Sequence, residues 1–322
     1  MTLKQLAYRA VGLSINAQSL LSTAAAGRRA FYLFATPPPP RIRPKEANFL
    51  ATATRTTTRF TSMEGHRFDL PVYSWGPADG PVVFCAYGFG YNAGRWRHFV
   101  PTLAEAGRRV VAFDPPGHGY APKGHLIYPD YVALERQLIE ELGGIDLALV
   151  HSFGGGCLVE ALTQLPPHLR PRRACFMAIF SEVRWLFEGF RDVMQLRPSV
   201  FAALCNHIHH LTGRQLDEFD VTLSAPQLDW LETLLVHDPQ DEVTSYRSAL
   251  RNHSHWPNSW LYRPAGAGHH LGTAEVTRNV LAWLLEGTVP PGSEFNDGSK
   301  EPITVPSWQL NEGVKGVSTF YT

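Results

Sequence analysis

Short apolar runs alternate with helical stretches between residues 81 and 287, and this alternation restricts the fold more than any other feature. The runs lie at 81–87, 108–114, 145–151, 172–180, 232–238 and 259–264. Runs this apolar suit strands that are buried on both faces, and strands joined through helices lie parallel. The sequence therefore predicts an α/β fold with a mostly parallel sheet and helices on both faces.

The N-terminal segment, residues 1–53, has a different pattern. The apolar residues of its first helical stretch fall on one face, and they are Leu3, Leu6, Ala10, Leu13 and Ala17. We expect this face to pack on the rest of the protein, although it would also suit a helix lying on a membrane or against a partner. The proline-rich stretch 36–44 must be extended and forms a strap. A threonine-rich hairpin at 54–61 and 68–75 follows it.

The alternation breaks once, between residues 181 and 228. This stretch carries aromatic and aliphatic residues at helical spacings and has no strand-like run, so it is interpreted as a helical cap inserted into the core. The core then comprises residues 54–180 and 229–287. Residues 288–322 are rich in Gly, Pro, Ser and Asn and are expected to form an irregular tail.

The stretch LALVHSFGGG, residues 147–156, places a serine where a predicted strand ends and a helix begins. Ligands of open α/β sheets bind at the carboxyl ends of the strands. A sharp strand-to-helix turn at this point pushes the hydroxyl of Ser152 out of the sheet, and Gly154 and Gly155 keep the chain beside it thin. The pattern predicts a nucleophilic serine, the alternative being an ordinary helix N-cap.

A serine nucleophile needs a general base and a carboxylate that orients the base. His269, in the glycine-rich loop RPAGAGHHL, is the candidate base, and its neighbour His270 is the alternative. Asp241, which follows another predicted strand, is the candidate acid. Asp238, three residues away, and Glu182, which follows the preceding predicted strand, remain alternatives for that role.

An oxyanion formed during acyl transfer requires hydrogen-bond donors. One candidate is the backbone N–H of Phe153, directly after the serine. The other is the N–H of Phe89 in the stretch AYGFG, where Gly88 and Gly90 leave room for it to face the site.

The predicted cap is rich in aromatic residues with few charges near them, which predicts an apolar substrate pocket. Tyr87, Trp185 and Phe190 are the candidate substrate-binding residues. The stretch HIHH at 207–210 has no matching carboxylate or cysteine pattern, so it is interpreted as part of a surface helix and not as a metal site. We expect no metal and no cofactor.

Four motifs together resemble the α/β-hydrolase fold superfamily, over residues 68–287. YGFG stands where the family usually has a His-Gly motif, and DPPGHG (114–119) matches its Asp-x-x-Gly-His-Gly turn. HSFGG matches the nucleophile elbow and GAGHH the histidine loop, and the order serine, aspartate, histidine is also that of the family. Three positions depart from the pattern: Val150 replaces the first glycine of the elbow, Tyr87 replaces the histidine of the oxyanion loop, and Tyr120 follows GHG where a serine is common.

The resemblance implies a capped serine hydrolase that cleaves a small to medium apolar ester or related acyl bond. A serine at the elbow argues against dehalogenase and epoxide hydrolase chemistry, in which a carboxylate attacks carbon. The alternative is a non-catalytic binding or scaffold protein of the same fold.

The overall composition restricts the partners. Acidic and basic residues number 29 each, which gives no electrostatic reason to expect nucleic acid. The four cysteines are far apart and form no CxxC pair, as is usual in a reducing compartment. No apolar stretch is long enough to cross a bilayer. We therefore expect a cytoplasmic protein that acts on a small-molecule substrate.

Overall fold

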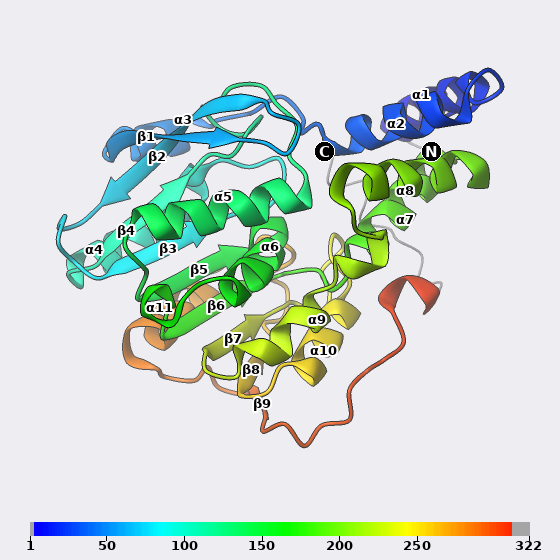
Figure 1. Cartoon of the computed structure of the whole chain (residues 1–322). Coiled ribbons are helices and arrows are strands. Elements are labelled where there is room, and N and C mark those ends of the chain that lie inside the picture. Colours follow the sequence, from blue (N-terminus) through cyan, green and yellow to red (C-terminus); the bar gives the residue numbers. More distant parts are fainter. Residues whose placement is uncertain (1–2, 311–322) are drawn as a thin grey trace.

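A nine-stranded sheet in the order β1-β2-β4-β3-β5-β6-β7-β8-β9 forms the centre of the structure, a computed structural model that describes residues 3–310 (Figure 1). The six central strands, β4, β3, β5, β6, β7 and β8, are parallel to one another. Strands β1 and β2 at one edge and β9 at the other pair antiparallel to their neighbours. The strands are β1 (Thr54–Thr61), β2 (Arg67–Trp75), β3 (Val82–Ala86), β4 (Arg109–Phe113), β5 (Leu147–His151), β6 (Arg173–Met177), β7 (Glu232–Val236), β8 (Ser259–Tyr262) and β9 (Glu294–Asn296). The predicted fold class is confirmed.

Helices cover both faces of this sheet, and each face has its own apolar core. Successive side chains of a strand point to opposite faces, so Phe84 and Ala86 of β3 join one core while Val83 and Cys85 join the other. The first core is covered by α5 (Tyr128–Glu141), α6 (Ser152–Thr163) and α10 (Tyr246–His255), and the second by α3 (Pro44–Leu50), α4 (Val100–Glu105) and α11 (Ala274–Glu286). Two short 3₁₀ turns, η1 (Ala93–His98) and η2 (Pro167–Leu169), lie in the connections.

The segment predicted as a cap, residues 181–228, consists of helices and 3₁₀ turns joined by short loops. It contains α7 (Val183–Met194), α8 (Pro198–Thr212), the single turn α9 (Val221–Ser224) and the 3₁₀ turns η3 (Leu216–Glu218) and η4 (Ala225–Leu228). Helix α8 ends where Gly213 adopts a left-handed φ of 72°, a backbone that glycine adopts without strain. The chain then returns to the sheet through β7.

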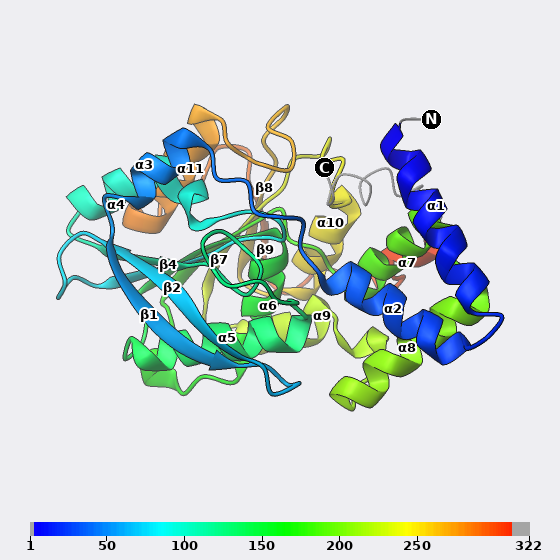
Figure 2. The same ribbon diagram turned by 90° about the horizontal axis from the view of Figure 1, so that it is seen from above.

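The N-terminal segment adds two more helices to this cap. Helices α1 (Leu3–Gln18) and α2 (Thr23–Ala35) lie against α7 and α8, at the end of the molecule away from the sheet (Figure 2). Helix α2 approaches α8 so closely that a Cβ on Gly27 would be 2.6 Å from the backbone carbon of Ala203. The proline-rich stretch 36–43 has no helix or strand and links α2 to α3. No helix within residues 3–310 combines the length and the apolar character needed to cross a bilayer.

The N-terminal helix packs on the protein as expected, but through a different face. Ile15 is fully buried, and a Cβ on Gly12 would be 1.7 Å from the carbonyl oxygen of Met194. The predicted apolar stripe points to solvent instead: Leu6 and Leu13 are 46% and 66% exposed, and Ala10 and Ala17 are exposed as well. The side chain of Leu3 lies outside the described residues. The prediction failed because the packing face of α1 contains Gly12. Glycine allows the backbone of α1 to approach Met194 closely, but it is not an apolar side chain that a search for an apolar stripe would detect.

The expectation of an irregular C-terminal tail is wrong for residues 294–296, which form β9 on the edge of the sheet. Asn296 is buried, and its side-chain amide donates to the carbonyl oxygens of His253 (2.5 Å) and Trp256 (3.1 Å). The short turn η5 (Ser307–Leu310) packs against α7, and residues 311–322 lie outside the described part. Hydrogen bonds attach this polar strand to the sheet, so apolar periodicity could not reveal it.

The close contact between α2 and α8 leads to a test of the cap. Gly27→Leu should lower the free energy of unfolding by about 1–3 kcal/mol, because the added side chain has no space against Ala203. Ala24→Leu, at an exposed position of the same helix, should change it by less than about 0.5 kcal/mol. Urea unfolding of both variants measures the difference, and equal stability of the two would contradict the packing of α2 described above.

Candidate active site

Ser152 occupies a strained turn between β5 and α6. Its φ is +52°, a left-handed value that is uncommon for a residue with a side chain and costs on the order of 1–3 kcal/mol. The serine is only 2% exposed and begins helix α6 at the carboxyl end of a central strand. This is the geometry of a nucleophile elbow, in which the hydroxyl projects above the sheet.

Three consecutive glycines allow the turn to sit deep in the protein. A Cβ on Gly154 would be 2.6 Å from the carbonyl oxygen of Tyr87, and one on Gly156 would be 2.4 Å from the ring of Phe180. A Cβ on Gly155 would be 3.2 Å from a methyl carbon of Val150. Val150, which departs from the family pattern, is therefore accommodated because Gly155, which lies against it, has no side chain.

His269 bridges Ser152 and Asp241. Its Nε2 is 3.2 Å from Ser152 Oγ, and its Nδ1 is 2.8 Å from Asp241 Oδ2. The backbone around the histidine is held from two sides. The carbonyl oxygen of His269 is 2.8 Å from His151 Nε2, and the amide of Gly268 donates to Asp238 Oδ2 at 2.6 Å. The structure thus brings together the three residues that the sequence analysis selected.

Asp241 is held in the anionic form. Its side chain is fully buried and accepts hydrogen bonds from the amides of Val243 (2.7 Å) and Thr244 (3.0 Å) and from the Thr244 hydroxyl (2.8 Å). Burial alone would raise the pKa of this carboxyl, but the hydrogen bond and charge of His269, the nearby His237 and the amide of Val243 outweigh burial and lower it. An anionic carboxylate at this point fixes the orientation of the imidazole. Thr244 was not anticipated, because a hydroxyl three residues after the acid has no distinctive sequence signal.

The alternative residues have other partners. Asp238 accepts the amides of Gly268 and Gln240 and so fastens two loops. Glu182 is buried and accepts the amide of Ser307 at 2.8 Å, with Arg251 at 3.2 Å. His270 is exposed and contacts the hydroxyl of Tyr91. Asp241 is thus the candidate acid whose carboxylate lies at hydrogen-bond distance from His269 Nδ1.

The two candidate oxyanion donors lie beside the serine. Phe153 is in the first turn of α6, where backbone N–H groups have no partner within the helix. Within the described residues, no hydrogen bond uses the amide of Phe89 as donor. A Cβ on Gly88 would be 2.6 Å from Ser152 Cβ and 3.4 Å from the nitrogen of Phe153, so the loop before Phe89 passes directly over the elbow.

Tyr87, a predicted substrate-binding residue, has a completely buried side chain whose partners lie inside the protein. Its hydroxyl donates to Asp114 at 2.6 Å, and its carbonyl oxygen accepts the hydroxyl of Tyr131 at 2.7 Å. Asp114, the first residue of the DPPGHG motif, also accepts the hydroxyl of Tyr73 and the amides of Ala93 and Tyr120. The tyrosine that replaces the family histidine therefore positions the oxyanion loop through a buried carboxylate.

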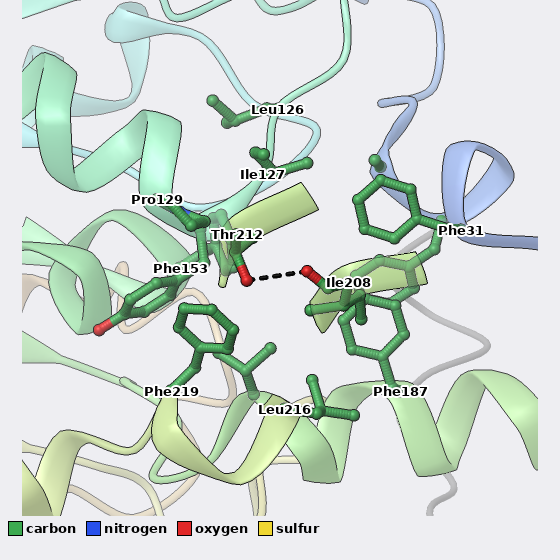
Figure 3. Close-up of a pocket in the computed structure, with 14 residues that line it drawn as sticks. Phe31, Leu126, Ile127, Pro129, Phe153, Phe187, Ile208, Thr212, Leu216 and Phe219 are labelled. Atoms are coloured by element: carbon green, nitrogen blue, oxygen red, sulfur yellow. Dashed lines mark hydrogen bonds between the residues drawn. The ribbon is translucent and has the colours of Figure 1, made fainter. Parts of the chain in front are cut away.

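An apolar cavity of about 410 Å³, including its open mouth, lies between the core and the cap (Figure 3). It is lined by α2, the start of α5, α7, α8 and η3, together with Phe153 of α6. Its lining includes Phe31, Ile127, Phe187, Ile208, Leu216 and Phe219. The hydroxyl of Thr212 donates to the carbonyl oxygen of Ile208 at 2.8 Å (Figure 3). Phe153 directly follows Ser152 in the chain and is the one elbow residue in the lining, which does not include Ser152, Asp241 or His269.

Two predicted pocket residues do not line this cavity. Trp185 and Phe190 are buried in the cap, whereas Val183 and Phe187 of the same helix face the cavity. The sequence identified the aromatic helix, but the helix rotation that decides which ring faces inward depends on packing against α1 and α2. Phe31, Phe34 and Ala35 of α2 also line the cavity, although nothing in their sequence pattern linked them to the site.

The histidine cluster at 207–210 is part of α8, as predicted. The ring of His207 packs edge-on against Phe31, with ring centroids 5.0 Å apart. Among residues 3–310, no three His, Cys, Asp or Glu side chains are grouped so that they could hold a metal ion.

Comparison with known proteins gives partial sequence matches. A serine hydrolase-like protein of Dictyostelium discoideum is 29% identical over 144 residues, which are 42% of this chain and 40% of that protein. A bifunctional esterase/perhydrolase of Acinetobacter calcoaceticus is 31% identical over 103 residues, 30% of this chain and 37% of that protein. Epoxide hydrolase B of Mycobacterium tuberculosis is 33% identical over 96 residues, 30% of this chain and 25% of that protein. The matches thus span less than half the length of these relatives.

Solved structures and a family model cover more of the chain. A bromoperoxidase from Bacillus anthracis superposes with a TM-score of 0.54 at 17% identity, over 72% of this chain and 99% of that one. A monoacylglycerol lipase from Paleococcus ferrophilus gives a TM-score of 0.53 at 19% identity, over 68% of this chain and 99% of that one. These two likenesses show the fold. Residues 82–280, more than half of the sequence, match the model of the alpha/beta hydrolase family. The chain belongs to the alpha/beta hydrolase family.

Proposed function

We propose that this protein is a serine hydrolase that cleaves a small to medium apolar ester or related acyl bond. The observation that carries the proposal is the continuous set of contacts from Ser152 Oγ through His269 to the buried carboxylate of Asp241. A nucleophile, a base and an orienting acid in this arrangement form a catalytic triad.

In the proposed mechanism, Ser152 Oγ attacks the acyl carbon and His269 Nε2 takes the hydroxyl proton. The N–H groups of Phe89 and Phe153 stabilise the negative charge on the tetrahedral intermediate. His269 then gives the proton to the leaving alcohol, and an acyl group remains on Ser152. Water, activated by the same histidine, releases the acid and restores the serine. Asp241 stabilises the imidazolium that forms in both steps.

The substrate preference is inferred from the cavity beside Phe153. Its lining is apolar apart from the hydroxyls of Thr212 and Tyr128, and that of Thr212 is already hydrogen-bonded to Ile208. A buried charge without a partner is costly, so the cavity suits an acyl chain or a ring and disfavours a charged group. The matches to an esterase/perhydrolase and a monoacylglycerol lipase are compatible with acyl chemistry.

A non-catalytic scaffold of the same fold is the second candidate, and Val150 and Tyr87 are the residues that would suggest it. Val150 packs beside Gly155 without crowding the elbow, and Tyr87 is bound to Asp114 beneath the oxyanion loop. These two departures from the family pattern are thus accommodated around an assembled triad, which favours an active enzyme.

The first test of the proposed function is removal of the nucleophile. Ser152→Ala should lower hydrolysis of a small activated ester by at least about 10⁴-fold, while the circular dichroism spectrum stays that of the wild type. Turnover within a few-fold of the wild type would rule out the assigned nucleophile.

A second test distinguishes the three carboxylates. Asp241→Asn should reduce kcat on the order of 10⁴-fold, since an amide cannot stabilise the imidazolium or hold the required tautomer. Glu182→Gln is the matched control, because it removes one charge whose partners are Ser307 and Arg251. Asp238→Asn, which alters the acceptor of the Gly268 amide, should lower kcat far less than Asp241→Asn. A loss of kcat in Glu182→Gln that equals the loss in Asp241→Asn would mean that the acid is misassigned.

A third test addresses the cavity. Across p-nitrophenyl esters from acetyl to dodecanoyl, kcat/KM should pass through a maximum at intermediate length, with about 1–3 kcal/mol of discrimination for each methylene that fits. Phe187→Ala should move the maximum to longer chains, because this ring forms part of the wall. Leu186→Ala, a buried position on the same helix outside the cavity, should leave the maximum unchanged. A steady fall from acetyl onward would show that the cavity does not receive the acyl group.

A further inference from the structure

The exposed face of helix α1 continues into the turn that joins it to α2. Leu6, Ala10, Leu13 and Ala17 recur at alternating intervals of four and three residues, so they form one stripe along the helix. Leu20 and Leu21 extend the stripe into the turn and are 75% and 93% exposed. These six residues form the leucine stripe, and it contains the three most exposed large apolar side chains among the described residues, Leu13, Leu20 and Leu21.

The orientation that exposes this stripe is fixed by specific contacts. On the opposite face of α1, the side chain of Asn16 donates to the carbonyl oxygen of Gln195 and accepts the amide of Arg197, both at 2.9 Å. Ile15 is buried beside it, and Gly12 lies directly against Met194. Rotation of α1 to bury the leucines would break these contacts. The stripe is therefore a stable feature of the surface.

The same segment carries a concentration of positive charge. Its first 45 residues contain seven Lys and Arg and no Asp or Glu, in a chain whose total charge is zero. Arg9 is exposed within one turn of Leu6 and Leu13. Arg29 is exposed on α2 and donates to Ser14 Oγ at 3.0 Å, which holds its guanidinium against α1.

Carboxylates of the neighbouring helix do not neutralise this charge, because they are already paired. Glu188 forms ion pairs with Arg184 and Arg191, and Asp192 accepts Arg191 at 2.8 Å. The α1–α2 hairpin lies at the outer edge of the molecule in both views (Figures 1 and 2), so a flat partner can reach it without meeting the core.

We propose that the α1–α2 hairpin docks on the surface of a membrane that contains anionic lipids. The leucine stripe enters the boundary between headgroups and acyl chains, and Arg9 and Arg29 contact lipid phosphates. Amphipathic helices that combine leucines with basic residues bind membranes in this way, lying in the plane of the interface. Two copies of this protein that paired through the stripe would bring two basic hairpins together, and their repulsion favours the membrane as the occupant.

Docking of this kind would also place the cavity near the lipid, because Phe31, Phe34 and Ala35 of α2 form part of its wall. The docking proposal rests on α1, the turn and the arginines, and it does not depend on the proposed hydrolytic activity.

Sedimentation of the full-length chain with lipid vesicles tests the proposal. The wild type should pellet with phosphatidylcholine vesicles that contain about 30 mol% phosphatidylserine and much less with phosphatidylcholine alone, and about 0.5 M salt should weaken the binding. The double variant Leu13→Glu, Leu21→Glu should lower the partition coefficient at least about tenfold. Arg9→Glu with Arg29→Glu should reduce binding to the anionic vesicles in particular.

Leu223→Glu is the matched control, because Leu223 is 58% exposed on α9, outside the hairpin, and it should bind vesicles like the wild type. Wild type that stays in the supernatant with anionic vesicles would overturn the proposal. Equal pelleting of the wild type and the double leucine variant would do the same. A wild-type dimer in analytical ultracentrifugation that the leucine variant dissociates, without vesicle binding, would show instead that the stripe joins two copies of the chain.

Discussion

The left-handed backbone of Ser152 is the constraint on which the rest of the site depends. This conformation is unfavourable for a serine, so the surrounding structure must hold it. Three groups lie close around the turn: the loop before Phe89, the carbonyl oxygen of Tyr87 and the ring of Phe180. A Cβ on Gly88 would collide with Ser152, and Cβ atoms on the three glycines after Phe153 would collide with Tyr87, Ile179 and Phe180. The elbow is therefore stabilised by tight packing around residues that lack side chains.

Buried polar residues position the three loops that meet at the elbow. Asp114 connects Tyr87 of the oxyanion loop to Tyr73 of β2 and to the start of η1, and Asp238 connects the β7 loop to the amide before His269. Removing a hydrogen-bond partner from a buried carboxylate costs free energy. Movement of any of these loops away from Asp114 or Asp238 is therefore unfavourable. The geometry around Ser152 thus depends on residues that do not themselves take part in the proposed reaction.

The succession of strands and helices in the core, and the contact of Ser152, His269 and Asp241, could be predicted because both follow from local patterns. Each parallel strand is a short apolar run, and Ser152, Asp241 and His269 each lie in the loop that follows such a run. The cavity could not be predicted, because its wall combines α2 with α7 and α8, which are separated by more than a hundred residues. Trp185 and Phe190 were assigned to it from their helix, but the rotation of α7 depends on contacts that a single helix does not reveal. The face of α1 was misassigned for a related reason, since Gly12 and Asn16 form its contacts while its leucines remain exposed.

The central claim is that Ser152 is an activated nucleophile, and reaction with a fluorophosphonate tests it most directly. The phosphonate reacts covalently with a serine that an adjacent base activates, and peptide mapping by mass spectrometry identifies the modified residue. The account predicts one phosphonate per chain, attached to Ser152. Absence of any adduct, or an adduct on another residue while Ser152 remains unmodified, would contradict it.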